Sequence, residues 1–367
     1  MARVGISLFV GVLAFGGSAG AEVPVRVRIA TAQQQIRLAG TALRVEGKPM
    51  PGDRVVVVAA RDGNILAGPV RQRGSVHGTA EGHLEIEGRR LPGSVTVLRT
   101  PEGRLDAVNV VPLERYVERV VSGEIYARWP AEALKAQAVA ARTYALYAVS
   151  RHREDSFDVE ATTLSQRYVD GPVPGTVREA VDATRGRYLV FQGAPILAAF
   201  HTTAGGRTAA SEEVWGEPLP YLRGVDSPDE ESPEFFWSYE VEYGELRRAL
   251  EIAGLRAGSD PRVEVLERSP SGRVARLSVS GAQLTGRTLR QILGERAIRS
   301  TLFDVRTEGG LVRFLGSGSG HGVGLSQWGA LQMAREGRTY TEILRHYFPG
   351  TQERSLDGSA AAPGAGP

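Results

Sequence analysis

Glu124 is the residue whose position in the sequence most strongly indicates chemistry. Leu113, Val117, Val120 and Glu124 follow the spacing i, i+4, i+7 and i+11, which places them on one face of an α-helix. Three apolar side chains define the buried stripe of this helix, and a carboxylate takes the fourth place. A carboxyl group held against an apolar surface resists ionisation. We therefore expect Glu124 to have a raised pKa, the property that a general acid needs near neutral pH.

The spacing leaves two other interpretations of Glu124 open. Its side chain could lie at the fraying end of the helix, or it could pair with Lys135 or Arg142, because structural ion pairs perturb carboxylates as well. Two neighbouring carboxylates, Glu114 and Glu118, lie off the apolar stripe. The pattern predicts that both of them are solvated.

Lys135 and Arg142 lie seven residues apart on one face of a predicted alanine-rich helix, 131–150, and Gln137 is displaced from that face. Periodicity favours a solvated basic stripe for the two cations. The alternative is that they donate hydrogen bonds to Glu124 or to the hydroxyl groups of a sugar.

Two histidines have settings that suggest a binding site. His201 ends an apolar run, 196–200, and His321 lies within Gly320–Gly324, where glycines would let a ligand approach the backbone closely, although such a run can also be a simple flexible turn. No HExxH motif or comparable ligand spacing occurs among the six histidines, so we expect no metal and no cofactor. The sequence also carries no nucleophile-elbow, phosphate-loop or dinucleotide-binding motif.

The composition excludes several classes of protein. The 367 residues include 44 Lys and Arg against 42 Asp and Glu, a balance that argues against nucleic-acid binding. The 42% hydrophobic content is ordinary for a globular protein. Because the chain contains no cysteine, disulfides, thiolate zinc sites and a cysteine nucleophile are excluded.

The N-terminus resembles a secretory leader. Arg3 precedes an apolar run, 4–15, and small residues follow at 19–21, so residues 1–21 are predicted to be a signal peptide. The alternative is a membrane anchor, but the run is shorter than the roughly 20 apolar residues that span a bilayer. We expect the protein to be exported to the periplasm or cell wall.

The remaining elements alternate between strand-like and helix-like patterns. Residues 22–105 are predicted to be β-rich, because apolar residues alternate with polar ones between Gly, Pro and Asp turns. Helices are expected from Pro112 to about Tyr126, over 131–150, and over 325–336, the last one ending before Gly337. A capping box at Thr339 predicts a further short helix, and the Gly- and Ala-rich tail, 352–367, is predicted to be disordered. Other predicted elements are strands at 54–60, 83–87, 94–99 and 105–110, a helix at 244–253, and hairpins at 262–280 and 300–314.

Several of these stretches together resemble the SpoIID/LytB family of bacterial sporulation and cell-wall proteins. The first is 113–144, with a glutamate followed by Trp-Pro and the run ALKAQAVAARTY. The second consists of the shorter pieces 165–168, 198–206 and 213–216. The third is 318–330, GSGHGVGLSQWGA, together with the ending 346–351. The resemblance covers about residues 105–351, so residues 106–351 are expected to form a SpoIID/LytB-like catalytic domain.

The resemblance implies a peptidoglycan lytic transglycosylase that cleaves the bond between N-acetylmuramic acid and N-acetylglucosamine in glycan strands stripped of stem peptides. The family's catalytic glutamate falls on Glu124. The polar groups implied to line the glycan groove are Lys135, Gln137, Arg142, Tyr168, His201, His321, Ser326 and Gln327. Phe200 and Leu325 stand where relatives often have tyrosine and methionine, and neither change removes an ionisable group. Some relatives bind zinc partly through cysteines, which this chain lacks.

The expected fold class is α+β, with a mixed sheet and packed helices that form a glycan-binding groove, plus the N-terminal β-rich region. A rival hypothesis is non-enzymatic. Relatives of the LytB type are modifiers of a separate amidase, so the chain could bind peptidoglycan glycan and stimulate that partner. A third and weaker hypothesis is that residues 22–105 alone form a wall-binding module.

Overall fold

The computed structural model describes residues 22–162, 165–260 and 262–357. The predicted signal peptide, 1–21, lies outside these residues. The chain divides into two compact units. The first contains the described residues up to Glu124 together with Ala141–Leu197 and the residues from Gln352 on, and the second contains Ile125–Ala140 and Ala198–Thr351.

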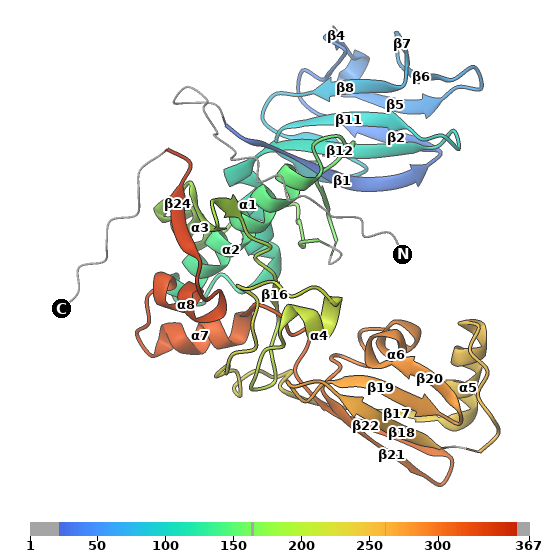
Figure 1. Cartoon of the computed structure of the whole chain (residues 1–367). Helices are drawn as coiled ribbons and strands as arrows, with labels where there is room; N and C mark the ends of the chain where they lie inside the picture. The colour runs from blue at the N-terminus through green and yellow to red at the C-terminus, as the bar shows by residue number, and fades with distance from the viewer. Residues whose placement is uncertain (1–21, 163–164, 261, 358–367) are drawn as a thin grey trace, which may run out of the picture. The chain divides into compact units, whose positions relative to one another are not determined.

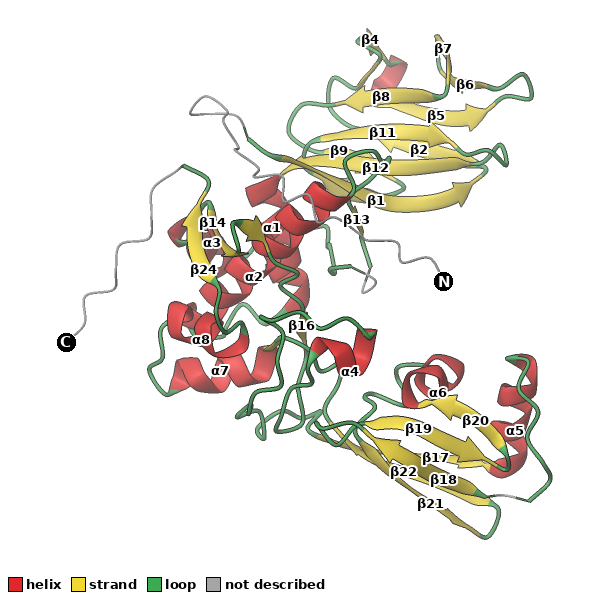
Figure 2. Ribbon diagram, viewed as in Figure 1, coloured by secondary structure: helices red, strands yellow, loops and turns green. Residues whose placement is uncertain are grey.

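Two β-sheets make up the N-terminal part of the first unit (Figures 1 and 2). The seven-stranded sheet has the order β13-β1-β12-β11-β8-β3-β4, and the six-stranded sheet has the order β10-β9-β2-β5-β6-β7. Their strands are β1 (Pro24–Gln33), β2 (Gln35–Ala39), β3 (Arg44–Val45), β4 (Lys48–Pro49), β5 (Arg54–Ala59), β6 (Asn64–Ala67), β7 (Val70–Arg73), β8 (Ser75–Thr79), β9 (Leu84–Ile86), β10 (Arg89–Leu91), β11 (Ser94–Arg99), β12 (Leu105–Pro112) and β13 (Val159–Glu160).

Alternating burial explains how these two sheets pack. Val25 and Val27 of β1 are buried, as are Ile36 and Leu38 of β2, while the residues between them are more exposed. This alternation with a period of two residues is typical of a half-buried strand. Contacts between β12 and β2 and between β11 and β9 hold the sheets together. The predicted strands at 54–60, 83–87, 94–99 and 105–110 are confirmed as β5, β9, β11 and β12.

Strand β12 connects the N-terminal sheets to the first helix. Strand β12 begins at Leu105, pairs antiparallel with β1 from Gln33↔Leu105 to Pro24↔Pro112, and leads directly into helix α1 (Leu113–Glu124). The N-terminal strands are therefore joined to the following helix within one compact unit.

The rest of the first unit is helical, with one small sheet. It contains α1, the second half of α2 (Ala131–Arg151) and α3 (Gly175–Ala183). Strand β14 (Arg187–Phe191) lies between β15 (Ala194–Pro195) and β24 (Gln352–Ser355), and its antiparallel register with β24 runs from Arg187↔Ser355 to Val190↔Gln352. The start of the predicted disordered tail is therefore a strand, because β14 offers it a free edge. The remainder, 358–367, lies outside the described residues.

The second unit combines short helices with a set of antiparallel strands. Helices α4 (Ser211–Trp215), α7 (Gln327–Arg335) and α8 (Tyr340–Tyr347) accompany a two-stranded parallel sheet of β16 (Phe200–His201) and β23 (Leu325–Ser326). The capping box at Thr339 is confirmed: its hydroxyl accepts the Glu342 N–H, and the Glu342 carboxylate accepts the Thr339 N–H.

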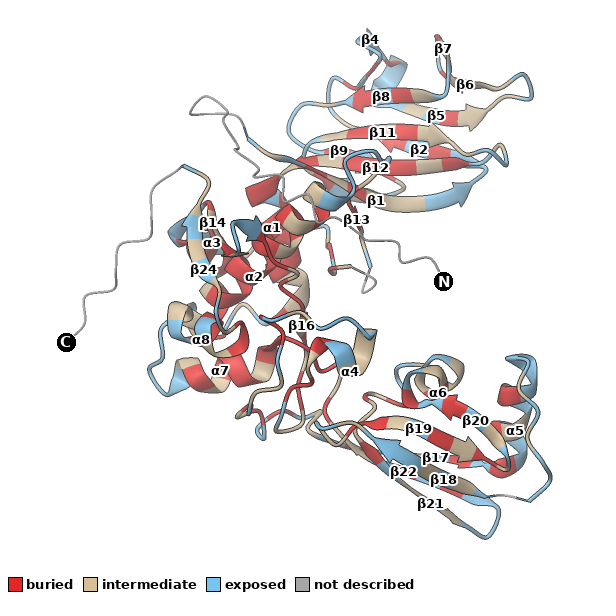
Figure 3. Cartoon of the chain, in the orientation of Figure 1, coloured by how far each residue is buried: buried red, intermediate tan, exposed pale blue. Residues whose placement is uncertain are grey.

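Residues 236–317 of this unit have a hydrophobic core of their own (Figure 3). Two three-stranded sheets, β17-β22-β21 and β18-β19-β20, pack with two helices. The elements are β17 (Phe236–Glu242), α5 (Tyr243–Ile252), β18 (Val263–Arg268), β19 (Val274–Val279), β20 (Ala282–Thr285), α6 (Gly286–Leu293), β21 (Phe303–Glu308) and β22 (Leu311–Ser317). The predicted helix at 244–253 and the hairpins at 262–280 and 300–314 are confirmed.

The expected α+β class is confirmed by sheets of both kinds of pairing together with eight helices in the described residues. Among those residues, none of the helices combines the length and the apolar character that crossing a membrane would require.

Candidate functional site

The nine predicted site residues fall into two sets, one in each compact unit. Glu124, Arg142 and Tyr168 belong to the first unit. The second unit holds Lys135, Gln137, His201, His321, Ser326 and Gln327.

Glu124 is the last residue of α1, at the end of the predicted apolar face. Leu113, Val117 and Val120 are buried as expected, and Glu124 itself is half-buried. Its Oε1 accepts a hydrogen bond of 2.7 Å from the backbone N–H of Arg167. A carboxylate bonded to a backbone N–H has a fixed orientation, because the donor belongs to the main chain and not to a mobile side chain.

The segment 165–171, which we call the strap, holds this arrangement against α1. The strap approaches α1 at Gly123, where a Cβ would lie only 2.5 Å from the Arg167 carbonyl oxygen. The Tyr116 hydroxyl donates to Gln166 Oε1 over 2.9 Å, and Arg119 donates to the Gly171 carbonyl. Glycine at 123 is therefore what allows Arg167 to come close enough to bond Glu124.

Tyr168 is part of the strap and is buried, with 2% of its surface exposed. Its ring stacks on Tyr116 with 5.4 Å between ring centroids, and its hydroxyl donates to Asn109 Oδ1 over 2.8 Å. Burial raises the pKa of both tyrosines far above the ordinary value, so the two hydroxyls stay protonated. The position of Tyr168 supports the strap from beneath and does not fit its expected place on a groove surface.

Arg142 is fully buried, which corrects the prediction of a solvated basic stripe. Its Nε and Nη2 donate to Oε1 and Oε2 of Glu114 over 2.9 and 2.6 Å. Glu114 Oε1 also accepts the Gly186 N–H over 3.0 Å. This two-pronged pair joins α1 to α2 inside the first unit, so the expected contact of Arg142 with sugar has no support from its position.

The prediction that Glu114 and Glu118 are solvated is wrong: they are only 6% and 4% exposed. Glu114 is buried with Arg142, and Glu118 accepts two hydrogen bonds from Arg115 Nη1 over 3.1 Å. Helix α1 is therefore enclosed on more than its apolar stripe, and its off-stripe carboxylates are paired with arginines.

In the second unit, the glycine run 316–324 packs directly on other backbone and side chains. A Cβ on Gly318 would lie 2.9 Å from the Ala204 carbonyl oxygen, one on Gly320 would lie 2.7 Å from His201 Cβ, and one on Gly324 would lie 2.2 Å from the Ala199 carbonyl oxygen. The alternate glycines thus form a tight seam with residues 199–206. Their role is close packing. The alternative of a simple flexible turn does not apply to these glycines.

His201 and His321 are brought together by this seam, with ring centroids 5.3 Å apart. His201 Nδ1 lies 3.1 Å from the Val323 carbonyl oxygen, and His321 Nδ1 accepts the Val323 N–H over 3.1 Å. The Trp215 ring lies 5.5 Å from His321. Two of the residues expected to form a site therefore lie side by side in the second unit.

Burial controls the charge of both histidines. Desolvation lowers the pKa of His321 to about 4, and the neighbouring arginines act in the same direction. Desolvation also lowers the pKa of His201 far below its ordinary value, aided by His321 and Arg273. Both rings are therefore neutral near pH 7, so each can offer one N–H donor and one acceptor nitrogen.

Arg273 acts on both histidines electrostatically and was not predicted from the sequence. It is 3% exposed, and its Nη2 donates to the Ala204 carbonyl over 2.9 Å. Burial lowers its pKa to about 10. A Cβ on Gly322 would lie 2.2 Å from Arg273 Nη2, so the guanidinium rests directly on the glycine run.

Asp229 is a second residue that the sequence did not single out. It is 1% exposed, and its Oδ2 accepts hydrogen bonds from the Ala204 N–H over 2.5 Å and from the hydroxyls of Ser227 and Ser326 over 3.1 and 2.7 Å. Ser326 is fully buried and caps α7 by accepting the Gly329 N–H. Ser326 thus positions α7 and the 204–206 loop, a role that its place in a loop-to-helix junction could have suggested.

Lys135, Gln137 and Gln327 lie on or against α2 within the second unit. Lys135 Nζ pairs with Glu132 over 2.7 Å and is partly exposed, so it remains accessible to a ligand. Gln137 is 1% exposed, and Gln327 Nε2 lies 3.5 Å from its Oε1, the longest of these contacts.

An aromatic pocket lies entirely within the second unit, and part of its lining comes from residues shortly after Glu124 in the sequence. Its cavity of about 360 Å³ is lined by Arg128, Trp129, Pro130, Trp328, Leu331 and Arg335. The Trp129 and Trp328 rings meet edge to face at 5.4 Å. Indole faces flanked by two arginines suit the apolar faces and the carboxylate groups of an acidic sugar. The described residues contain no group of three or more His, Asp and Glu side chains arranged to hold a metal ion.

Comparison with known proteins matches both units. A family described as "Stage II sporulation protein" matches residues 101–191, and a domain of unknown function matches residues 209–324. The chain is 34% identical over 304 residues to stage II sporulation protein D of Bacillus amyloliquefaciens, which covers 77% of this chain and 86% of that protein. The protein of the same name from Bacillus subtilis (strain 168) is also 34% identical, over 287 residues, 72% of this chain and 80% of the relative.

A further relative carries a different name. The chain is 28% identical over 282 residues to a B. subtilis protein named amidase enhancer, a match that covers 63% of this chain and 39% of that longer protein.

Proposed function

Because the chain belongs to the stage II sporulation protein family, we propose that it remodels the bacterial cell wall as a lytic transglycosylase, with Glu124 as the acid and base. The substrate is the glycan strand of peptidoglycan, and the bond cleaved joins N-acetylmuramic acid to N-acetylglucosamine. One observation carries the proposal: the half-buried Glu124 carboxyl group is held by the Arg167 N–H at the end of an apolar helix face.

The orientation of the carboxyl group fits an acid. Oε1 accepts the Arg167 N–H, and the carbonyl oxygen of a neutral carboxyl group is the better acceptor, so the acid form carries its proton on Oε2. Glu124 would donate that proton to the glycosidic oxygen and then, as carboxylate, accept the proton of the muramic 6-hydroxyl. Attack of this hydroxyl oxygen on the anomeric carbon closes a 1,6-anhydro ring, so a single carboxyl group suffices where most glycosidases use two.

The second unit has groups of its own that suit a polymeric sugar. The indole rings of Trp129 and Trp328 would contact pyranose faces, while Arg128 and Arg335 would pair with the lactyl carboxylate of muramic acid. Lys135 offers a further donor to hydroxyl groups, and the neutral His201 offers Nε2 as an acceptor, because its Nδ1 faces the Val323 carbonyl oxygen.

The test is product analysis on peptide-free glycan strands by mass spectrometry. The wild-type chain is expected to yield anhydro-ended fragments, and Glu124→Gln is expected to lower their formation by about 10²- to 10⁴-fold, the usual contribution of general acid–base catalysis. Glu179→Gln is the matched control, because Glu179 lies exposed on α3 of the same unit. Fragments with reducing ends that have gained water would contradict transglycosylation and indicate hydrolysis.

A second function follows from the relative named amidase enhancer. In this alternative the chain binds glycan and stimulates a separate cell-wall amidase without cutting the strand. It is favoured if neither the wild-type chain nor Glu124→Gln forms products while both raise the rate of an added amidase equally.

We further propose that residues 1–21 direct export to the periplasm or cell wall, on the basis of the charged start and apolar run of this segment. Fusion of these residues to a reporter enzyme that is active only outside the cytoplasm tests this. Replacing part of the apolar run 4–15 with charged residues should abolish reporter activity.

A further inference from the structure

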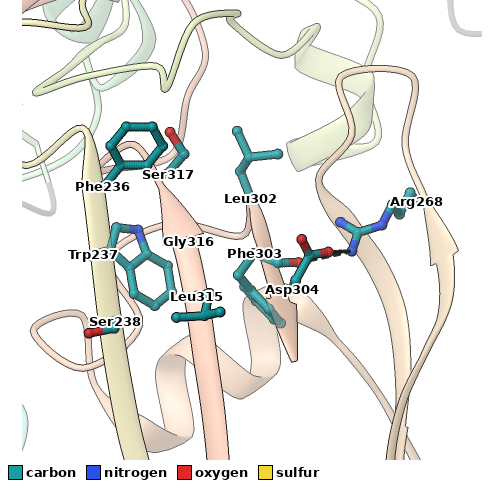
Figure 4. A pocket seen from close by; sticks show the side chains of 10 residues that line it. All are labelled: Phe236, Trp237, Ser238, Arg268, Leu302, Phe303, Asp304, Leu315, Gly316 and Ser317. Carbon is teal, nitrogen blue, oxygen red and sulfur yellow. Dashed lines mark hydrogen bonds and ion pairs between the residues drawn. The ribbon is translucent and has the colours of Figure 1, made fainter. Parts of the chain in front are cut away.

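A second cavity lies at one end of the sheet β17-β22-β21, within the range 209–324 that matches the domain of unknown function (Figure 4). Its volume is about 720 Å³, within the range of small-ligand sites. All of its lining residues belong to the second unit, between Phe236 and Ser317. None of them is among the residues to which we assign a role in the proposed cleavage.

The floor of the cavity carries an unpaired hydrogen-bond donor. Trp237 pairs across the strands with Gly316, and its indole lies so close to this glycine that a Cβ there would be 2.1 Å from the ring. The side chain is 8% exposed, and Nε1 has no hydrogen-bond partner among the described residues. Figure 4 shows this nitrogen on the edge of the ring nearer to Phe236 and Ser317. A buried donor without a partner is costly, and an acceptor atom of a bound ligand would satisfy it.

Apolar and polar walls surround this donor. Phe236 is 78% exposed and Leu315 is 38% exposed, both unusually open for large apolar side chains. At the opposite wall, Arg268 Nη2 pairs with Asp304 Oδ1 over 2.6 Å, and the Asp304 side chain is 79% exposed. The two charges cancel, so the rim offers hydroxyl-binding groups with no net attraction for an ion.

We propose that this cavity binds an N-acetylated hexosamine of a glycan strand, an inference that rests on the proposed action on peptidoglycan. The acetamido carbonyl oxygen accepts the Trp237 Nε1–H, and the acetamido methyl group packs on Leu315. The pyranose face covers Phe236, and ring hydroxyls bond to Asp304 and Arg268. The domain would thereby hold the polymer at a point separate from the cleavage chemistry.

The mixed character of the walls favours a sugar over a protein partner. A docking surface for an apolar side chain needs no donor at its floor, and burying Trp237 Nε1 under such a side chain would leave the donor unsatisfied. An uncharged sugar amide satisfies the donor and covers the exposed apolar surface at the same time.

The experiment follows the indole N–H signals of the four tryptophans by NMR in the full chain carrying Glu124→Gln. The probe is an N-acetylglucosamine tetrasaccharide, and loss of one signal in Trp237→Phe identifies Trp237. We expect that signal to shift in a saturable titration, and Phe236→Ala to weaken the affinity measured there by about tenfold. Ile252→Ala is the matched control, because Ile252 is 89% exposed on α5 and lies outside the cavity, and it should leave the affinity unchanged.

Several outcomes would overturn the inference. They are a Trp237 signal that does not move at saturating tetrasaccharide, an affinity unaffected by Phe236→Ala, and a signal that shifts only with a stem peptide. Because binding is read at Trp237 in a chain without Glu124, absence of anhydro products from the wild-type chain would refute the cleavage and leave this result unaffected.

Discussion

At the scale of single residues, the structure separates groups that face a ligand from groups that hold the fold. Glu124 is half-buried and oriented by a main-chain donor, whereas Arg142 is wholly enclosed with Glu114. Lys135 and Arg142 had equal standing as site residues by their spacing, yet of these two only Lys135 is exposed enough to meet a ligand. Burial and pairing decide which of two similar side chains is available for chemistry.

The lowered pKa of His321 predicts that stability depends on pH. A histidine whose folded pKa is depressed is held neutral, so its contribution to stability is complete above the unfolded value of 6.5 and is lost as the pH falls toward about 4. Between about pH 7 and about pH 5 this single group should cost about 2 kcal/mol of unfolding free energy. His321→Asn, which keeps an acceptor near the Val323 N–H, should reduce the loss by that amount in urea titrations. Equal losses in both proteins would contradict the prediction.

The contact of Gly322 with Arg273 predicts that replacing this glycine with alanine lowers the free energy of unfolding strongly. Gly322→Ala places a Cβ 2.2 Å from the guanidinium at a φ of +80°, whereas Gly337→Ala has nothing within 4 Å at a φ of +84°. The two variants share the backbone strain, so their difference isolates the packing clash. We expect Gly322→Ala to be at least about 2 kcal/mol less stable than Gly337→Ala by chemical denaturation. Similar stabilities would show that Arg273 can move away at little cost.

At the scale of elements, the strap 165–171 and helix α1 together position Glu124. Neither the helix nor the strap alone fixes Glu124, because the donor is the Arg167 N–H and the approach depends on Gly123. The tyrosine pair beneath them, Tyr116 and Tyr168, gives the strap a rigid support.

Gly123→Ala should therefore displace the strap and misplace Glu124. We expect the turnover number on glycan strands to fall by about tenfold to a hundredfold with KM little changed, because a small misplacement of a catalytic group is costly. Gly175→Ala is the matched control, since Gly175 begins α3 of the same unit and has open space around it.

Hydrogen exchange at the Arg167 amide gives a readout of Gly123→Ala that does not depend on activity. The Gly123 variant should exchange this proton faster than the wild type, because its bond to Glu124 is lost or lengthened. Unchanged exchange and unchanged turnover would together refute the role of the strap.

At the scale of the whole molecule, the chain passes between its two compact units four times, after Glu124, Ala140, Leu197 and Thr351. Each unit is therefore assembled from separate stretches of sequence, and helix α2 contributes to both. Within the second unit, however, residues 236–317 surround a continuous hydrophobic core, and their ends are paired as Phe236↔Ser317 in neighbouring strands.

This local closure predicts that an excised fragment, residues 233–318, folds by itself. Its termini are adjacent and its core includes Leu246, Leu277 and Phe314, so most of its apolar contacts stay intact. Circular dichroism should show strand and helix signals with a cooperative urea transition. A fragment that unfolds without cooperativity would show that contacts from the rest of the second unit are required.

Local patterns in the sequence were enough to predict many of the elements and the face of α1 on which Glu124 lies. Helix α1, the capping box at Thr339 and the strands with alternating Val25 and Val27 depend on periodicity and on side chains a few residues apart. Such short-range signals can be read without knowing what the element packs against. The family resemblance also came from the sequence, because its motifs are long and occur in order.

The burial of polar side chains and the identity of their partners could be read only from the folded chain. The pattern of α1 placed Glu114 and Glu118 in solvent, but a helix can be enclosed on faces that its own apolar stripe does not mark, and Arg142 covers one of them from 28 residues away. Asp229 gathers donors as distant as Ser326, 97 residues along the chain. Partners of this kind are set by chain topology, which local spacing does not encode.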